Sequence, residues 1–499
     1  MMELKRPILA AIIILLSSVI AIMVIAVMHF KNDTIPVGLK YGIVFDAGAS
    51  STTVYVYYWP AEKENNTGVV SEKYKCKIEG SAISDFDYNP AKAASSLEQC
   101  LNKTIEEIPA EKHNATPLYF GASAGMRLLR TQNSSASTMI LSAIENYLRS
   151  SPFDFKGAQI ISGKEEGAYG WISANYLLGN FRQRRIWKQL NRPFTVKTKG
   201  TLDLGGASAE IAFVPRMHSR KYEITEITLY NNKYEVYIES LGCYGRDEAE
   251  NIYWANLIQK SANKSSIEDP CLPSHYTMIL PMEEVLASSC IGAKLQEDYD
   301  ANNNITLVGT GNPIQCRHQL VSIFNFRSSY VKGIWRERLV PINRLLHGKF
   351  VAFSGFSDTM EALNLTGSFS IDVFHSTVRS FCRKNWNQVQ QLLPNVPDLY
   401  RKAFCFNAYY IFVLLMKGYK FNPQTWTNIN FQKQVGNNSI GWSLGYMLNL
   451  TNMIPAENQV SQTPMSESAF CGLLLLFIVL ALFCSFFICI SVIQSIPFI

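Results

Sequence analysis

The sequence is poor in charge and lacks two patterns that mark common classes of protein. Only 17% of its 499 residues are charged, and the formal net charge is +6. No basic stretch is interleaved with aromatic residues, so we expect no nucleic-acid partner. No two cysteines have the Cys-x-x-Cys spacing of a zinc site. The basic stretch 327–349 is expected to be a solvated loop, and the length allows two or three domains.

Charge is missing altogether from two segments, 8–28 and 469–492. Each is longer than the roughly 20 residues that span a bilayer, so we predict transmembrane helices at 8–30 and 469–492 with cytoplasmic tails 1–7 and 493–499. The alternative for the first is a cleaved signal peptide, but its apolar run is too long and no small-residue cleavage site follows. Lys5 and Arg6 should keep the N-terminus in the cytoplasm. We therefore expect a multi-pass plasma-membrane protein with an extracellular middle segment.

Two features of the middle segment agree with this topology. It holds every Asn-x-Ser/Thr sequon that we assign, and such sites receive glycans outside the cytoplasm. The sequons begin at Asn32, Asn65, Asn102, Asn114, Asn133, Asn263, Asn304, Asn364, Asn437 and Asn449. It also holds an even number of widely spaced cysteines, which favours disulfides in an oxidising compartment. They are Cys76, Cys100, Cys243, Cys271, Cys290, Cys316, Cys382 and Cys405.

The most informative pattern is a strand–loop–strand unit that occurs twice, at 43–59 and 201–214. Each unit runs from an apolar β-type stretch into Asp-x-Gly, then small residues, then a second β-rich run. A lone Asp-x-Gly of this kind is usually only a hairpin turn. Two copies favour glycine loops that aim backbone N–H groups at one phosphate chain from both sides. Asp46 and Asp203, at the strand ends, can hold a divalent cation directly or through water.

Two further motifs are weaker when each is taken alone. Residues 116–127 read as a strand that enters a helix through a Gly/Ala-rich turn, which often serves only close packing. Residues 163–177 read as a helix with Glu165 and Glu166 in its first turn, where the helix dipole favours carboxylates. Adjacent helical residues point about 100° apart, so at most one glutamate faces a cleft. A carboxylate beside a bound phosphate can serve as a general base for water.

Five segments occur in the order of the apyrase signatures and resemble those of the ectonucleoside triphosphate diphosphohydrolases. They are 46–52, 121–127, 163–171, 203–208 and 353–365. Segments 57–70 and 441–452 strengthen the resemblance, which is greatest to the type 3 branch of the membrane-bound members. It implies an α/β, actin-like (RNase H-like) two-lobed fold with an interlobe nucleotide cleft, flanked by two transmembrane helices. Lobe I would be 36–161 plus 428–460, and lobe II would be 162–427.

The resemblance also implies a reaction and its residues. The substrates would be nucleoside tri- and diphosphates (ATP, ADP, UTP, UDP), hydrolysed to monophosphate and phosphate with Ca²⁺ or Mg²⁺. Glu166 would activate water, Ser208 would position it with Glu210 beside it, and Asp46 and Asp203 would hold the hydrated metal. The phosphates would bind Gly48, Ala49, Ser50, Ser51, Thr52, Ser123, Gly205, Gly206, Ala207 and Ser208. The disulfides would be Cys76–Cys100, Cys243–Cys290, Cys271–Cys316 and Cys382–Cys405. Self-association through the transmembrane helices is compatible with this arrangement.

The chain departs from the family pattern within the expected site. Ala49 stands where the family usually has Ser, and Ala209 and Glu210 stand where it has Thr and Gln. Glu210 puts a second carboxylate near Glu166, which should raise the pKa of one of them. Asp358 replaces an aromatic and so removes about 1–3 kcal/mol of base stacking. We expect an active enzyme; the alternatives are a nucleotide-binding pseudoenzyme, a surface receptor or adhesion protein, and another actin-fold enzyme such as a sugar kinase or polyphosphatase.

Overall fold

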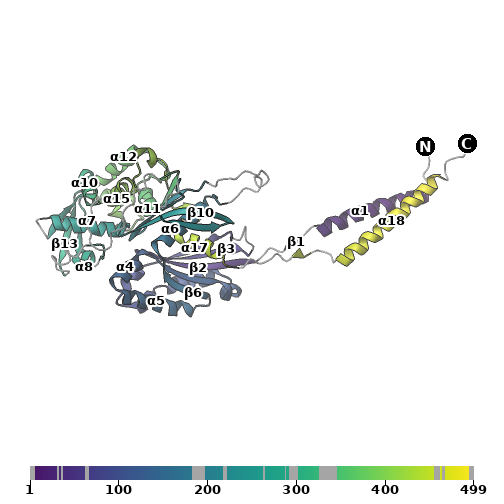
Figure 1. The fold of residues 1–499 in the computed structure, drawn as a ribbon, viewed down its shortest axis with the longest axis horizontal. Helices are drawn as coiled ribbons and strands as arrows, with labels where there is room; N and C mark the ends of the chain where they lie inside the picture. The colour runs from purple at the N-terminus through teal and green to yellow at the C-terminus, as the bar shows by residue number, and fades with distance from the viewer. Residues whose placement is uncertain are drawn as a thin grey trace. The chain divides into compact units, whose positions relative to one another are not determined.

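The computed structural model describes most of the chain, in two units (Figure 1). The described residues are 6–30, 33–34, 38–61, 67–181, 197–216, 222–261, 265–286, 288–291, 302–324, 346–454, 461–462 and 467–493. One unit comprises 1–38 and 456–499, and the other comprises 39–455. Most of both predicted tails, the basic stretch up to residue 345, and the sequons at 32, 65 and 263 lie outside the described residues.

The first unit contains two long apolar helices, α1 (Arg6–Phe30) and α18 (Glu467–Ile493). They pack against each other, and strands β1 (Asp33–Thr34) and β18 (Ser461–Gln462) pair antiparallel beside them. The stretches 6–26 and 468–493 each have a mean hydropathy of 3.2 and are long and apolar enough to cross a membrane. The two predicted apolar helices are thus confirmed.

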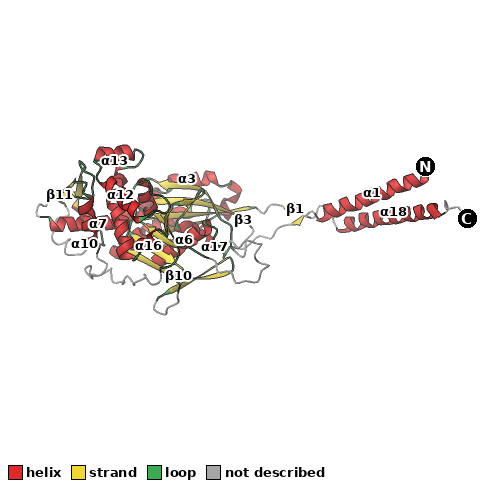
Figure 2. Ribbon diagram, turned by 90° about the horizontal axis from the view of Figure 1, so that it is seen from above, coloured by secondary structure: helices red, strands yellow, loops and turns green. Residues whose placement is uncertain are grey.

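The second unit is built on two mixed sheets. The strands of the first are β2 (Leu39–Ala47), β3 (Thr52–Pro60), β4 (Ser71–Ile78), β5 (Pro117–Ala122) and β6 (Asp154–Ile160). The strands of the second are β7 (Gly200–Leu204), β8 (Ser208–Phe213), β9 (Ile224–Leu229), β10 (Asn232–Gly242), β14 (Phe350–Ser354) and β15 (Ile429–Phe431). Figure 2 shows both sheets in yellow, with red helices around them.

The two sheets share one topology. Their orders are β4-β3-β2-β5-β6 and β15-β14-β7-β8-β10-β9, so the initial strand, β2 or β7, is central in each. That strand pairs antiparallel with the strand that follows it, β3 or β8, and parallel with β5 or β14 on its other side. The outer pairs repeat the same directions, and β9 is an added hairpin strand in the second sheet. The internal duplication suggested by the two glycine loops is therefore confirmed at the level of topology.

Helices pack on each of the two sheets, and each sheet with its helices forms one half of the unit with its own apolar core. The first sheet packs against η1 (Ile83–Phe86), α2 (Pro90–Ser95), α3 (Glu98–Glu107), η2 (Ala110–Ala115), α4 (Ala124–Gln132) and α5 (Ser134–Arg149). The second half also holds α7 (Arg246–Lys260), α8 (Met282–Leu286), α10 (Pro313–Ile323), α11 (Gly355–Ala362), α12 (Ile371–Cys382), α13 (Trp386–Leu392), α14 (Asp398–Arg401), α15 (Phe404–Val413) and α16 (Pro423–Trp426). A small sheet there joins β11 (Ser266–Asp269), β13 (Asn304–Gly309) and β12 (Thr277–Pro281), and a short ribbon joins β16 (Gln434–Val435) and β17 (Asn438–Ser439).

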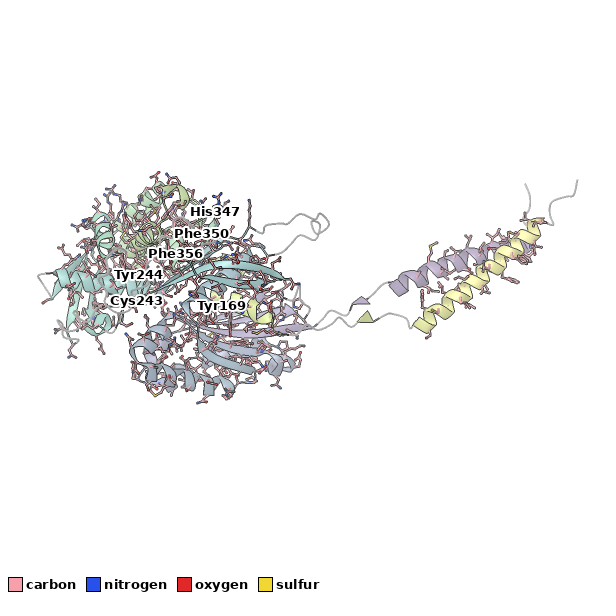
Figure 3. All side chains as sticks on the ribbon, in the orientation of Figure 1. Tyr169, Cys243, Tyr244, His347, Phe350 and Phe356 are labelled. Carbon is pink, nitrogen blue, oxygen red and sulfur yellow. A yellow bond between two sulfur atoms is a disulfide. The ribbon has the colours of Figure 1, made fainter. Side chains whose placement is uncertain are left out.

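Two helices with their own apolar cluster join the sheets. Helix α6 (Gly163–Leu177) leads from β6 of the first sheet towards β7 of the second, and α17 (Trp442–Thr451) packs on α6 and on β2. A Cβ at Gly445 would lie 1.9 Å from the Tyr169 carbonyl oxygen, so this glycine permits the close crossing of the helices. Figure 3 shows Tyr169 beside the yellow α17. The cluster includes residues of both sheets, among them Val44 and Ala212.

The predicted lobe boundaries stay a prediction, with one detail corrected. Strand β15 pairs parallel with β14, so residues 429–431 extend the second sheet. The expected return to lobe I, 428–460, therefore has to begin after β15. Only the later part, with α17, packs against the first sheet.

Four disulfides fasten the two halves internally. They are Cys76–Cys100, Cys243–Cys290, Cys271–Cys316 and Cys382–Cys405. These are the pairs that the family resemblance implies. Cys76–Cys100 ties β4 to α3 under the first sheet, whereas the other three lie in the second half.

Candidate active site

The two glycine loops have the same geometry. The first hairpin leaves residues 48–51 unpaired between Ala47 and Thr52, and the second leaves 205–208 between Leu204 and Ala209. Each loop is closed by a backbone hydrogen bond of 3.0 Å, from Gly48 to Ser51 in the first and from Gly205 to Ser208 in the second. By position, Ser51 corresponds to Ser208, and Asp46 corresponds to Asp203.

The loops also approach each other closely. A Cβ built on Gly206 would lie 3.2 Å from Ala49 Cβ of the first loop and 2.5 Å from Asp247 Oδ2. A Cβ at Gly125, in the first turn of α4, would lie 2.9 Å from Ala49 Cα. Ala49 therefore sits between α4 and the second loop, where the surroundings leave little room for extra atoms. The predicted facing arrangement of the two loops is what this contact requires.

Asp46, near the end of β2, is fixed by an indole. Trp442 Nε1 of α17 donates a 2.7 Å hydrogen bond to Asp46 Oδ1. Trp442 lies against β5, where a Cβ at Gly121 would come within 2.4 Å of the ring. The glycine that opens the second sequence motif thus makes room for the indole, and a residue from the end of the second unit sets the position of this carboxylate.

The two glutamates of the third motif have different surroundings. Ser162 caps α6: its hydroxyl accepts from the Glu165 N–H at 3.2 Å, and the Glu165 carboxylate accepts from the Ser162 N–H at 2.8 Å. This capping box explains why the helix starts here. Glu165 is exposed, whereas the side chain of Glu166 is buried. The two side chains therefore point into different surroundings, and the expectation that at most one of them faces the cleft stays a prediction.

Arg127 of α4 connects the buried acidic groups. Its Nη1 donates to Glu166 Oε2 at 2.8 Å and to the Ile161 carbonyl at 3.0 Å. Its Nη2 donates to Ser208 Oγ at 3.1 Å and lies 3.7 Å from Glu210 Oε1. One guanidinium from the first half therefore holds the candidate base and the second glycine loop together.

Glu210 is the most buried carboxylate of this group, with 2% of its surface exposed. Its Oε1 accepts hydrogen bonds from Ser208 Oγ at 2.5 Å and Ser240 Oγ at 2.8 Å. Its Oε2 has no hydrogen-bond partner among the described residues. Burial raises the pKa of Glu210 well above its usual range, and the charges of Glu166 and Asp203 raise it further. The predicted effect of adding a carboxylate next to Glu166 is thus confirmed, and it falls on Glu210.

Asp46 and Asp203 are suited to a hydrated cation. Burial raises the pKa of Asp46 to about 8 against the hydrogen bond from Trp442, which lowers it, and the charge of Glu166 adds to the increase. Burial and Glu166 raise the pKa of Asp203 to about 7. Such values mean that cationic charge is lacking near these oxygens. Among the described residues no three His, Cys, Asp or Glu side chains are arranged to hold a metal directly.

A family model describes this combination. The model of the GDA1/CD39 (nucleoside phosphatase) family matches residues 34–463. The chain belongs to this family. The match covers both glycine loops, Arg127 and Glu166, so the candidate site lies wholly within the matched residues. The family depends on a divalent cation, in agreement with the unbalanced carboxylates at Asp46 and Asp203.

Named members of the GDA1/CD39 family are similar over nearly the whole chain. Ectonucleoside triphosphate diphosphohydrolase 3 of Homo sapiens is 45% identical over 493 residues, 97% of this chain and 92% of the relative. The type 8 enzyme of Mus musculus is 41% identical, covering 91% of both chains. The type 1 enzyme of Bos taurus is 39% identical, covering 92% of this chain and 90% of the relative. The resemblance inferred from five short segments is confirmed.

A solved structure supports the fold. The crystal structure of nucleoside triphosphate hydrolases from Neospora caninum superimposes with a TM-score of 0.56 at 14% identity, covering 87% of this chain and 95% of that chain. The α/β fold class predicted from the sequence is confirmed.

The remaining predicted residues of this family member lie around the loops. Ser123 precedes α4, and its N–H already donates to the Ala47 carbonyl at 2.9 Å. Thr52 is buried beneath the first loop, and Ser50 is half-buried. Asp358 lies on α11, where burial of its carboxyl raises its pKa and the charge of Arg246 opposes this only in part. The phosphate-binding roles of these residues stay predictions.

Sequence reasoning assigned no role to several residues of the site, among them Arg127, Trp442, Ser354 and Ser240. Arg127 is the last residue of the segment 121–127, and Trp442 is the second residue of the segment 441–452. Both therefore lie in signature segments, but neither was given a function. Ser354, whose side chain bonds Asp203, lies at the end of β14 and within the signature segment 353–365, but it too was given no function. It adopts a φ of 52°, an uncommon conformation for a residue with a side chain.

Proposed function

We propose that this chain hydrolyses nucleoside tri- and diphosphates to the monophosphate and phosphate, with Glu166 as the general base. The observation that carries the proposal is the buried ion pair of Glu166 with Arg127, which also reaches Ser208 in the second glycine loop. A fixed, ionised carboxylate beside a phosphate loop is what activation of an attacking water requires. The named relatives are diphosphohydrolases of the same nucleotide class.

The proposed chemistry needs no covalent intermediate. Phosphoryl transfer depends mainly on alignment and on stabilisation of charge on the phosphate oxygens. The two loops would bind the phosphate chain, and Ser208 would orient the water towards the terminal phosphorus. Glu166 would accept the proton of that water. A bound Ca²⁺ or Mg²⁺, held through water by Asp46 and Asp203, would neutralise charge on the phosphate chain.

We infer that the ectodomain is extracellular. Six of the described sequon asparagines are exposed, as glycan attachment requires. They are Asn102, Asn114, Asn133, Asn304, Asn364 and Asn437. Removal of N-glycans from intact cells should therefore change the mobility of the protein in a gel, and no change would contradict this orientation.

The test of the reaction compares two adjacent glutamates. Membranes carrying the full chain would be assayed for phosphate release from ATP and ADP with Ca²⁺ or Mg²⁺ against EDTA. Glu166→Gln should lower the rate by about 10²–10⁴-fold, the contribution of a general base. Glu165→Gln is the matched control, because glutamine also completes a capping box and the side chain lies outside the buried network.

Three results are informative. Metal-dependent release that disappears only in Glu166→Gln supports the proposal. Equal rates for the two variants would contradict the role of Glu166. Absence of release from wild type, together with stabilisation of the protein by nucleotide, would instead indicate a nucleotide-binding protein without turnover.

A further inference from the structure

A cavity lies in the second half, lined by none of the residues of the candidate active site. Its volume is about 710 Å³, which is in the range of small-molecule sites. Three helical segments form its walls: α10, α12, and α15 with the π-helical turn η5 (Leu414–Gly418) that follows it. These helices pack on one another, and Figure 1 shows α10, α12 and α15 in the green part of the ribbon, away from α4 and α5.

The rim of the cavity is cationic. Arg317 of α10, Arg379 of α12 and Lys417 of η5 line it, together with two histidines, and no lining residue is acidic. Among the described residues no carboxylate forms an ion pair with Arg317 or Arg379. Burial lowers the pKa of His375, the charge of Arg317 lowers it further, and Asp372 opposes this only in part. The rim is thus complementary to an anion.

The floor of the cavity is apolar and aromatic. The Arg317 guanidinium lies over the Phe412 ring with its carbon 4.9 Å from the ring centre. The His375 ring meets the same phenylalanine edge to face, with 4.9 Å between ring centres. Tyr409 and Phe412 are buried, and Met416 adds an adaptable apolar surface. A planar guanidinium stacked in this way keeps its N–H edges free to bind an anion such as phosphate.

The walls are held in place independently of any ligand. Cys382–Cys405 ties the end of α12 to α15, and Cys271–Cys316 anchors α10. A further feature is the η5 turn itself, since π-helical turns inside helices are rare and occur frequently at functional sites. The cavity is therefore a braced site with a cationic rim and an aromatic floor.

We propose that this cavity binds a nucleoside monophosphate, with the phosphate at Arg317 and Arg379 and the base over the apolar floor around Met416. The chemistry of the cavity asks for one compact anionic group joined to a flat apolar body of this size. The choice of ligand rests on the proposed function, because hydrolysis releases a nucleoside monophosphate beside the same ectodomain. The site would thus sense the product of the reaction.

The test uses photolabelling of the purified full-length protein with 8-azido-AMP, followed by peptide mapping. Label is expected in the segments 313–324 or 404–418, and AMP should compete for it more strongly than adenosine. Arg317→Ala with Arg379→Ala should weaken this labelling by about tenfold or more, the loss expected for charge-assisted contacts. Lys92→Ala with Lys112→Ala removes equal charge from the first half and should leave labelling unchanged.

The outcomes separate this proposal from the proposed hydrolysis. The arginine double variant should hydrolyse ATP at the wild-type rate, and Glu166→Gln should keep the label at the cavity. Label confined to the glycine loops would overturn the proposal, as would equal labelling of the double variant and wild type. Equal competition by adenosine and AMP would show that the cationic rim binds no phosphate, which also overturns it.

Discussion

Replacing Glu210 by glutamine tests whether this buried carboxyl is protonated at neutral pH. Arg127, 3.7 Å away, attracts the ionised form by about 4 kcal/mol at an effective dielectric constant of 20. Burial and the charges of Glu166 and Asp203 act in the opposite direction and prevail, so the pKa is raised. Glutamine is also the residue that the family pattern has at this position.

A glutamine should fit the site with little loss. Its side-chain carbonyl can accept the hydrogen bonds from Ser208 and Ser240, and its NH₂ group takes the place of Oε2, which has no partner among the described residues. The exchange replaces an uncharged, protonated carboxyl group by an uncharged amide. We therefore expect kcat/KM at pH 7 to change by less than about fivefold, equivalent to about 1 kcal/mol.

The pH profile makes the test sharper. In wild type, ionisation of Glu210 at high pH would place a second negative charge beside the phosphates, so activity should fall on the alkaline side. Glu210→Gln should lose this fall, and phosphate release from ATP and ADP between pH 6 and pH 9.5 would reveal it. Glu210→Ala is the contrasting variant, because it leaves the hydroxyls of Ser208 and Ser240 without their acceptor. It should lower the free energy of unfolding by about 1–3 kcal/mol.

The opposite result has a clear meaning. A loss of about 10²-fold in Glu210→Gln at pH 7, with normal folding, would show that the ionised carboxylate takes part in the reaction. Glu210 would then be a second base or a cation ligand, and the protonated state inferred from its burial would be refuted.

Three further outcomes follow from the same contacts. Arg127→Lys should lower kcat by about 10²-fold while Tm stays near that of wild type, because lysine cannot span both acidic partners with two N–H edges; an unchanged kcat would contradict its positioning role. In EDTA, thermal stability should fall as pH rises from about 4 to 8, because the pKa values of Asp46 (about 8) and Asp203 (about 7) exceed those of the unfolded chain and the folded state then binds the extra protons. Ca²⁺ should restore more stability at pH 8 than at pH 5.5, and equal recovery at both would argue against cation binding there. Gly121→Ala should displace the indole that bonds Asp46 and lower both Tm and metal affinity, whereas Gly242→Ala, with open space around it, should change neither.

The repeated parts of the fold were predictable because they are local in sequence. Each glycine loop lies between two β-rich runs, so the two hairpins and their Asp residues could be placed from short segments. The start of α6 was equally local, since Ser162 and Glu165 form its cap within four residues. The four cysteine pairs came from the family order, because spacing alone leaves many pairings open.

The connections between these parts could not be predicted from local patterns. Arg127 contacts Glu166 and Ser208, which belong to different elements, and only the packing of α4 against the first loop brings them within reach. Trp442 reaches Asp46 from the far end of the second unit through the space left by Gly121. No periodicity or spacing encodes such contacts. The pairing of β15 with the second sheet was missed for the same reason.

The chemical asymmetry of the site arises within a symmetric framework. In the two matching hairpins, Asp46 faces Thr53 across the strands and Asp203 faces Glu210. The side of the first loop thus offers a carboxylate fixed by an indole. The side of the second loop gathers a serine, a buried acid and the guanidinium that holds Glu166. Two equivalent loops can grip a phosphate chain from both sides, but only the second is equipped to handle a proton. Water should therefore attack from the side of the second loop, and at alkaline pH, where Glu210 ionises, the departure from the family pattern at Glu210 should affect turnover more than that at Ala49.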